Sequence, residues 1–468
     1  MSNRIILGIL LAVLALSVGL TSRAATNVVA QGANFQQAIN AASSGDTLVV
    51  QSGIYNGDLN FDRSLTVLCS GTQIQFTGNV TVTNAADVSF SQCLFFGSLA
   101  ATTNTAVIFS QTVCSNSLTL SGSSFQAFDS QFLTLAATGG KVVLKRCSGS
   151  GNISLNATAF EALRLNCTSP LGSSGSIIAT APIGSVTRFV MTQSTITEYW
   201  WSVTGYEVYL GYNSIYGSGG FEPILLADYQ TLVTLTDCSA FVVGNVLYQD
   251  GMANADGAPL VMLRGFLHAY NNRIHSDTGG SSGNPGTLTI FDSGGDIINN
   301  TFEMEGAVRE GGSIGVVNGN TGPVIIRANA LHIHSGEGIF SGGLGQISEC
   351  SYCCIGSDYT PLDHVTGVNC LITDPILDLS GYTTMQPPLS WLSPMSGSPC
   401  VHAGPPDAIY NNTDGTRNTI GYTGGPLWNP ANYTNNNPLV FFLNTTNQTV
   451  VKGAQTNVQI NLGASAGH

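Results

Sequence analysis

The feature that most constrains the fold is a repeat, in which a short β-type segment with a polar residue near its end returns at intervals of roughly 20 to 30 residues. The markers of successive copies are Gln92, Gln111, Arg146, Asn166, Asn213, Asn245, Asn272, Asn300 and Asn329, and a further copy fits around Ser130. One copy cannot bury its own apolar face, so the copies must stack into a solenoid. We therefore expect an all-β chain in which residues 25–426 form a right-handed parallel β-helix of about eleven to thirteen coils.

Five of these markers are asparagines that follow one another along the chain: Asn213, Asn245, Asn272, Asn300 and Asn329. Asparagine tolerates left-handed backbone geometry, and its amide can form a hydrogen bond with a neighbour one coil away. We expect these five residues to stack near one corner of the solenoid.

Residues 1–24 have the pattern of a secretory signal peptide. One early cation, Arg4, precedes an apolar run from Ile5 to Leu14, and the Ser-Arg-Ala sequence at 22–24 fits the small-x-small cleavage rule. An N-terminal membrane anchor is the alternative. No later stretch approaches the roughly 20 apolar residues that a membrane-spanning helix needs. We expect a secreted or cell-surface protein without a membrane span.

The balance of charge excludes one class of partner. The 14 Lys and Arg residues include Arg4 and Arg23 of the expected leader, which leaves 12 cations against 27 Asp and Glu. Such an acidic chain repels nucleic acid and anionic membrane surfaces, so we expect no nucleic-acid partner. Only 9% of residues are charged and 55 are glycine, which suits the tight turns and uncharged faces of a β-solenoid.

Eleven cysteines in an exported chain favour disulfides over cytosolic metal or redox chemistry. Five of them recur close to the rung period: Cys69, Cys93, Cys114, Cys147 and Cys167. We interpret them as a buried column of small thiol side chains, with bridges between rungs as the alternative. The Cys350-x-x-Cys353 pair lacks the second pair that a zinc ribbon needs, so a disulfide is favoured there too.

The region before the first repeat has the pattern of a capping unit. Phe35, Ala38, Ile39 and Ala42 mark one apolar face of a short helix, and strands are expected at 48–50, 53–55 and 65–68. A helix placed before the first coil would cover the open end of the solenoid.

Two segments resemble a known family. The opening FQQAINAASSGDTLVVQSGIYNGDLNFDRSLTVLCSG, at 35–71, resembles the first coils of the secreted pectin-lyase-like superfamily of right-handed parallel β-helices. The tail motif at 374–426, with DPIL, SPCVHAG and NTDGTRNTIGYTGGP, resembles a recurrent end of these proteins, although His402 stands where Asp is common. We expect a polysaccharide or cell-surface glycan as partner, but the resemblance itself implies only the fold. It does not imply an activity, because the superfamily includes lyases, hydrolases and adhesins.

We expect this tail to close the far end of the solenoid, because an exposed coil end is an aggregation edge. A disulfide from Cys400 to Cys353 or Cys354 is expected to hold it there. Residues 427–437 form an Asn/Pro-rich linker. Residues 438–468 alternate like the first strands of a β-sandwich and are interpreted as part of an immunoglobulin-like module.

The sequence lacks most of the catalytic residues that lyases and hydrolases of this fold use. A polysaccharide lyase needs a Lys or Arg base and usually acidic residues that hold calcium. Beyond the leader the chain has only three lysines, Lys141, Lys145 and Lys452, and no Asp-Asp pair. The Asn-Thr-Asp triplet at 412–414 matches one hydrolase motif of the fold only superficially, because the other motifs are missing.

A better candidate site comes from aligning three rungs on their asparagines. Strand alternation directs His275, Glu303 and His332 into one outward column. A second column beside it holds Asp277, Glu305 and His334, and Tyr216 and Tyr248 precede the first column. The columns could be polar only because they face water. They could also form a catalytic or carbohydrate-binding groove, or hold a divalent metal.

A second candidate surface is aromatic. Tyr199, Trp200 and Trp201 begin a run rich in rings that continues to Tyr216. Exposed rings stack on sugars, whereas buried rings are ordinary solenoid packing.

Two functions follow from these residues. The first, which we favour, is a non-catalytic extracellular stalk or glycan-binding protein. The second is a polysaccharide lyase or glycoside hydrolase that uses His275, Glu303 and His332, with Asp277, Glu305, His334 and the aromatic residues binding the glycan. No cofactor is expected, and calcium is the one candidate.

Overall fold

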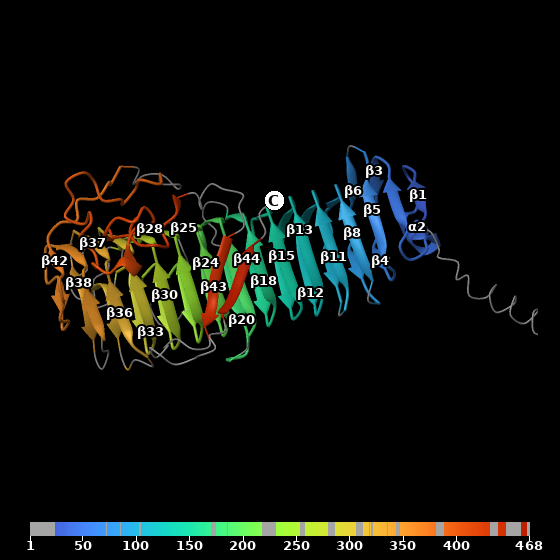
Figure 1. Ribbon diagram of the computed structural model, residues 1–468. Coiled ribbons are helices and arrows are strands. Elements are labelled where there is room, and N and C mark those ends of the chain that lie inside the picture. Colours follow the sequence, from blue (N-terminus) through green and yellow to red (C-terminus); the bar gives the residue numbers. More distant parts are fainter. Residues whose placement is uncertain are drawn as a thin grey trace, which may run out of the picture.

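The chain folds into a long stack of β-coils, a parallel β-helix (Figure 1). The structure is a computed structural model that describes residues 24–465 apart from 72, 85, 103, 170–174, 185, 218–230, 253–257, 279–285, 306–311, 318, 320–321, 335, 343–346, 381–387, 431–438 and 446–459. The expected signal peptide therefore lies outside the described residues, except for its last residue. Each strand of the stack pairs in parallel with its counterpart in the neighbouring coil.

The strands form three ladders, one on each face of the solenoid. The first ladder contains β1 (Thr26–Val29), β2 (Thr47–Val50), β5 (Leu65–Cys69), β8 (Asp87–Ser91), β11 (Ala106–Ser110), β13 (Ser124–Phe128), β15 (Lys141–Lys145), β18 (Ala159–Leu163), β21 (Arg188–Thr192), β24 (Glu207–Gly211), β27 (Ser239–Val243), β30 (Phe266–Tyr270), β33 (Gly294–Ile298), β36 (Val324–Arg327) and β39 (Glu349–Ser351). The second ladder contains β3 (Gly53–Tyr55), β6 (Ile74–Phe76), β9 (Leu94–Phe95), β12 (Val113–Ser121), β14 (Gln131–Thr138), β16 (Ser148–Gly149), β19 (Asn166–Thr168), β22 (Thr195–Thr197), β25 (Ser214–Gly217), β28 (Val246–Met252), β31 (Arg273–Thr278), β34 (Thr301–Met304), β37 (Ala330–Ile333), β40 (Cys354–Ser357) and β42 (Leu371–Ile372). The third ladder shares β12 and β14 and adds β4 (Leu59–Phe61), β7 (Val80–Val82), β10 (Leu99–Ala101), β17 (Ile153–Asn156), β20 (Gly175–Thr180), β23 (Tyr199–Thr204), β26 (Val233–Thr236), β29 (Leu260–Leu263), β32 (Leu288–Phe291), β35 (Gly312–Val317), β38 (Glu337–Gly342) and β41 (Leu362–Asp363).

The solenoid is longer than the sequence repeat indicated. The first ladder is a sheet of 15 strands, which exceeds the eleven to thirteen coils that we expected. The difference lies at the start of the chain, where β1, β2 and β5 precede the first marker, Gln92. The apparent starter unit therefore contains coils of its own.

A short helix caps the first coils, as predicted. Helix α2 (Phe35–Ala41) begins at Asn34, whose side chain accepts a hydrogen bond from the backbone amide of Gln37 at 3.1 Å. Its buried Phe35 ring packs 5.6 Å from the ring of Tyr55 and 5.1 Å from that of Phe76. The helix thus covers the aromatic end of the core.

The core runs through the interior of the stack, because alternate side chains of every strand point inward. Strand β5 shows the pattern, with buried and exposed residues in strict alternation. Equivalent side chains of successive coils then lie on top of one another, as Phe76 and Phe95 do at a ring distance of 5.1 Å. One contiguous cluster of buried residues extends from Val29 to Ile355.

From β8 onward, the chain turns from the first ladder to the second at a residue with left-handed backbone geometry. The residue directly after every first-ladder strand from β8 to β39 has a positive φ, which bends the chain in one step. The markers Gln92, Gln111 and Arg146 occupy this position. In the later coils, each of the five asparagines comes one residue after the left-handed position. The sequence repeat therefore aligned the early markers with the late ones one residue out of register.

The five asparagines form one continuous buried ladder, as predicted. The backbone amide of Asn213 donates to Oδ1 of Asn245 at 2.9 Å, and Asn245 donates to Asn272 at the same distance. Asn272 and Asn300 continue the series to Asn329. The physical reason differs from the expected one. The preceding residue takes the left-handed conformation, and the asparagine side chains satisfy amides that the corner leaves without a strand partner.

The tail motif lies along the side of the solenoid and does not close its end (Figure 1). Residues 374–426 add no further coil, and their described regular structure is a single bridge between Leu377 and Pro394 and a 3-10 helix, η1 (Ala408–Tyr410). The corner residue Asn271 donates to the carbonyl oxygen of Tyr422 at 2.7 Å. Corner residues that face outward therefore hold the tail on the flank of the last coils.

The last described residues form an antiparallel pair, β43 (Leu439–Thr445) and β44 (Ile460–Ser465). Residues 446–459 of this segment lie outside the described residues, and the immunoglobulin-like module stays a prediction. Among the described residues, no helix has the length and apolarity to cross a membrane.

Candidate functional site

The first predicted polar column exists in the expected register. His275 of β31 pairs with Glu303 of β34, which pairs with His332 of β37. Tyr216 and Tyr248 continue the column toward the N-terminus, with stacked rings 4.9 Å apart. The side chains point out of the solenoid because Ile274, Phe302 and Leu331, one residue earlier in each strand, fill the core.

Most of this column is nevertheless closed to solvent, so His275 and Glu303 neither face water nor line an open groove, two of the alternatives that the sequence left open. His275 and Glu303 are each 0% exposed. His275 Nδ1 donates to Glu303 Oε2 at 3.1 Å, and the His275 ring stacks on Tyr248 at 4.5 Å. Trp391 of the tail lies edge-on to the His275 ring at 6.1 Å. The tail motif thus contributes to the cover over the column.

Arg273 shows how firmly the tail is attached beside the column. Its buried guanidinium donates from Nη1 to the carbonyl oxygen of Pro388 at 2.8 Å and lies 5.0 Å from the centre of the Tyr422 ring. A buried charge needs such partners, because an unsolvated cation is costly. The contact joins residues more than 100 positions apart, which no local sequence pattern could indicate.

His332 is the one member of the predicted catalytic trio that reaches solvent. Its Nδ1 lies 4.0 Å from Glu303 Oε1, and its Nε2 lies 3.9 Å from Asp374 Oδ1. Burial lowers the pKa of His332, and the nearby His334 ring, at 4.5 Å, lowers it further. The imidazole is therefore neutral at neutral pH.

A pocket of about 230 Å³ opens beside His332. Its ionisable lining consists of His332, His334, Asp358 and Asp374. Sequence reasoning missed the two aspartates as site residues. Asp374 opens the DPIL segment of the tail motif, so its place in that motif was the only signal available. No Lys or Arg lines this pocket among the described residues.

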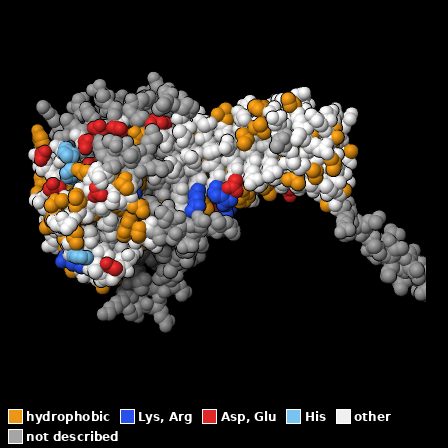
Figure 2. Space-filling model, turned by 90° about the horizontal axis from the view of Figure 1, so that it is seen from above, with side chains coloured by type: hydrophobic (Ala, Val, Ile, Leu, Met, Phe, Trp, Pro, Cys, Tyr) orange, Lys and Arg blue, Asp and Glu red, His pale blue; other side chains and the backbone are white. Residues whose placement is uncertain are grey.

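The second predicted column is more exposed than the first. Glu305 and His334 are exposed, and Asp277 is half-buried. Figure 2 shows acidic and histidine side chains gathered at the broad end of the molecule, whereas the slender end carries few charges on this face. Figure 1 shows that β28, β37 and β42 build the broad end. Strand β37, which carries His332, belongs to this end.

The predicted aromatic surface is largely core, which corrects the proposed binding role of two of its residues. Tyr199 and Trp201 point inward from β23 and are fully buried, and the Tyr199 hydroxyl donates to the carbonyl oxygen of Gly151 at 2.9 Å. Strand alternation leaves Trp200 half-buried on the outside. Tyr216 is half-buried and Tyr248 is buried beneath the tail.

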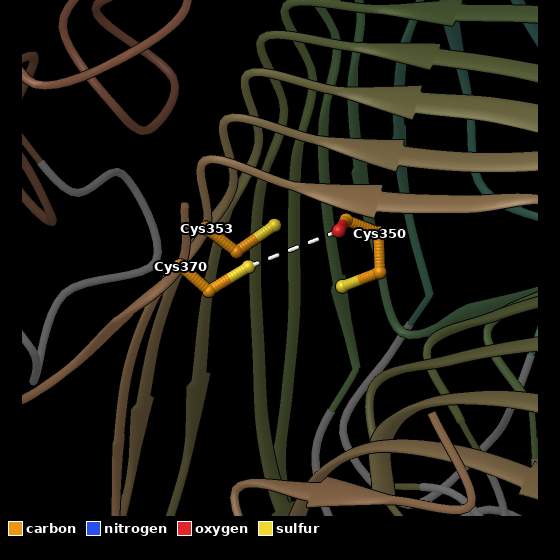
Figure 3. Close-up of side chains that lie close together, drawn as sticks. All are labelled: Cys350, Cys353 and Cys370. Atoms are coloured by element: carbon orange, nitrogen blue, oxygen red, sulfur yellow. Dashed lines mark hydrogen bonds between the residues drawn. The ribbon is translucent and has the colours of Figure 1, made fainter. Parts of the chain in front are cut away.

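The cysteines are free thiols in this structure, so the predicted disulfide is not formed in it. The tail does bring Cys400 to Cys354, and a hydrogen bond between these thiols, with burial, raises the pKa of Cys354. The alternative pairing with Cys353 is wrong, because Cys353 lies with Cys350 and Cys370 instead (Figure 3). A bond between Cys354 and Cys400 stays a prediction.

Figure 3 shows the sulfur atoms of Cys350, Cys353 and Cys370 directed into one space at the last coils of the solenoid. The three sulfur atoms lie within 4.8 Å of one another. Hydrogen bonds from Cys350 and Cys353 lower the pKa of Cys370. The five repeat cysteines are all buried, as expected, but they do not form a single column. Cys69 ends β5, Cys93 and Cys147 directly follow left-handed corner residues, and Cys114 and Cys167 lie in β12 and β19.

Comparison with known proteins identifies no family. No protein-family model and no curated protein matches the chain. An alginate lyase solved in complex with G6 covers 76% of this chain and 87% of its own length, at 13% identity and a TM-score of 0.30. A PL6 family polysaccharide lyase from Pseudopedobacter saltans covers 74% and 92%, also at 13% identity and 0.30. A pectate lyase covers 87% and 97% at 13% identity and 0.27. TM-scores this low carry no argument about this chain.

Proposed function

We propose that this protein is exported and binds a polysaccharide or cell-surface glycan without cleaving it. The observation that carries the proposal is the closure of the first polar column, because His275 and Glu303 have no access to a substrate. The leader pattern at 1–24 and the eleven cysteines support export. The acidic composition argues against nucleic acid as the ligand.

The pocket beside His332 supports binding better than it supports lyase chemistry. A lyase abstracts a proton next to a carboxylate, which requires a reachable base and a positive charge to neutralise that carboxylate. His332 is a neutral imidazole, but its Nδ1 is buried toward Glu303. The other charged groups of the lining are Asp358 and Asp374, which repel a uronate.

The size of the pocket suggests what part of a glycan it takes. Sites that enclose a drug-sized ligand usually measure roughly 300–1,000 Å³, and this pocket is smaller, at about 230 Å³. Carboxylates and imidazoles accept hydrogen bonds from sugar hydroxyls. We infer that Asp358, Asp374 and His334 bind one neutral sugar unit or the end of a chain.

The test is to pass neutral and uronate-rich polysaccharides over the immobilised protein, with and without calcium, while unsaturated products and reducing ends are measured. We expect retention of a neutral glycan without turnover. Retention should fall in Asp374→Asn and His334→Ala, and stay unchanged in Asp407→Asn, which alters an exposed aspartate of the tail outside the pocket.

Two outcomes would overturn the proposal. Turnover that disappears in His332→Ala would make the protein a polysaccharide-active enzyme. Retention that is lost in Trp200→Ala but kept in Asp374→Asn would move the binding surface to the outer face of β23.

A further inference from the structure

Two buried polar atoms beside the pocket lack hydrogen-bond partners. Oε1 of Glu303 and Nδ1 of His332 form no hydrogen bond with any described residue, and they lie 4.0 Å apart. Leaving a buried carboxylate oxygen or imidazole nitrogen without a partner is destabilising, so such atoms usually indicate a missing ligand, water or ion. A third group, His334, brings a ligand atom within 4.8 Å of both.

The set of donor atoms matches a transition-metal site. Two imidazoles and one carboxylate are a common ligand set for zinc and for non-heme iron, in which the remaining positions stay open. Zinc–nitrogen and zinc–oxygen bonds are each about 2.0–2.2 Å, which in a tetrahedral site places two ligand atoms roughly 3.4 Å apart. Glu303 Oε1 and His332 Nδ1, now 4.0 Å apart, therefore need to approach each other by about 0.6 Å to share an ion. His334 is exposed, so its ring can rotate to complete the set.

Neighbouring groups hold these ligands in the orientation that a metal needs. His275 donates to Oε2 of Glu303, which leaves Oε1 as the free oxygen. Asp374 Oδ1 lies 3.9 Å from His332 Nε2, on the opposite side of the ring from Nδ1. Carboxylate–histidine hydrogen bonds orient metal ligands in many proteins and affect affinity by roughly 10–100-fold. At 3.9 Å, Asp374 has to move closer to His332 to form such a bond.

We propose that Glu303, His332 and His334 bind one divalent transition-metal ion of the zinc class, with its open coordination positions facing the pocket. Calcium fits this set poorly, because it prefers six to eight oxygen ligands. The metal site does not depend on the glycan proposal, since each can fail without the other. If both hold, the open positions of the ion would face the sugar hydroxyls.

The competing cation site is the thiol cluster of Cys350, Cys353 and Cys370, so the test must separate imidazole from thiolate ligands. The full chain, treated with a chelator and then freed of it, is titrated with Zn²⁺ alone by calorimetry and with Co²⁺ alone by absorption spectroscopy. We expect one saturable site whose Co²⁺ spectrum lacks the near-ultraviolet charge-transfer band of a cobalt–thiolate bond.

Because His334 is exposed, substituting it tests metal binding without disturbing the fold. His334→Ala should weaken Zn²⁺ binding at least tenfold, and Glu303→Gln should do the same if it folds. His364→Ala is the matched control, because His364 is a strongly exposed histidine outside the cluster. Equal affinity in His334→Ala and the unchanged protein, a thiolate band on Co²⁺ binding, or no saturable binding would each overturn the proposal.

Discussion

The asparagine ladder offers the sharpest test of how this solenoid is stabilised, and Asn272 is at its centre. Its fully buried side chain takes part in four hydrogen bonds. Oδ1 accepts from the backbone amide and from Nδ2 of Asn245, at 2.9 and 3.0 Å. Nδ2 donates to the carbonyl oxygen of Val242 at 2.7 Å and to Oδ1 of Asn300 at 2.9 Å.

Asn272→Ala removes all four bonds and leaves the Asn245 amide buried without a partner. That orphaned donor costs about 1–3 kcal/mol, and each further lost bond costs about 0.5–1.5 kcal/mol. We expect the free energy of unfolding to fall by at least about 2.5 kcal/mol. Asn272→Ser should cost less, because Ser194 at the same corner of an earlier coil accepts the equivalent amide bond, from Leu165, through its hydroxyl at 3.0 Å.

Urea denaturation, followed by tryptophan fluorescence and circular dichroism, measures these differences. Asn166→Ala is the matched control, since Asn166 belongs to the same sequence repeat but is exposed on β19, and its loss should change stability by less than about 0.5 kcal/mol. An Asn272→Ala variant as stable as Asn166→Ala would refute the claim that the ladder stabilises the corner.

Three further predictions concern the tail and the pocket. Because burial holds the pKa of His332 below its ordinary value of 6.5, the unfolded chain binds the proton more tightly. The free energy of unfolding should therefore fall as pH drops below about 6.5, and fall less in His332→Asn when urea midpoints are compared across pH. Under oxidising conditions Cys354 and Cys400 should form a disulfide, detectable by peptide mass spectrometry, and Cys400→Ser should then lose roughly 2–4 kcal/mol that it does not lose under reduction. Arg273→Met should loosen the tail, seen as faster hydrogen exchange of the Tyr422 amide; unchanged exchange would show that Arg273 does not hold the tail.

Local sequence patterns were sufficient to predict much of the fold. The alternation in β31, β34 and β37 correctly directed His275, Glu303 and His332 outward, and the recurrence of asparagine located one corner of the solenoid. Both signals depend on a spacing of two residues or of one coil, which the chain carries in its own order.

The burial of the site could not be predicted in the same way. Whether an outward side chain meets water depends on what packs over it, and here the cover includes Trp391 and the segment that Arg273 binds at Pro388. These contacts join residues more than 100 positions apart in an irregular segment without periodicity. The tail motif was visible in the sequence, but its docking surface was not.

The measurement that tests the account most directly is the chemical accessibility of the histidines. Diethyl pyrocarbonate modifies exposed imidazoles, and peptide mass spectrometry reports the rate at each one in the native protein. Closure of the polar column predicts that His275, at 0% exposure, stays unmodified while His364, with 77% of its side chain exposed, reacts readily. Modification of His275 at a rate similar to that of His364 would contradict the closed column and, with it, the argument for binding without catalysis.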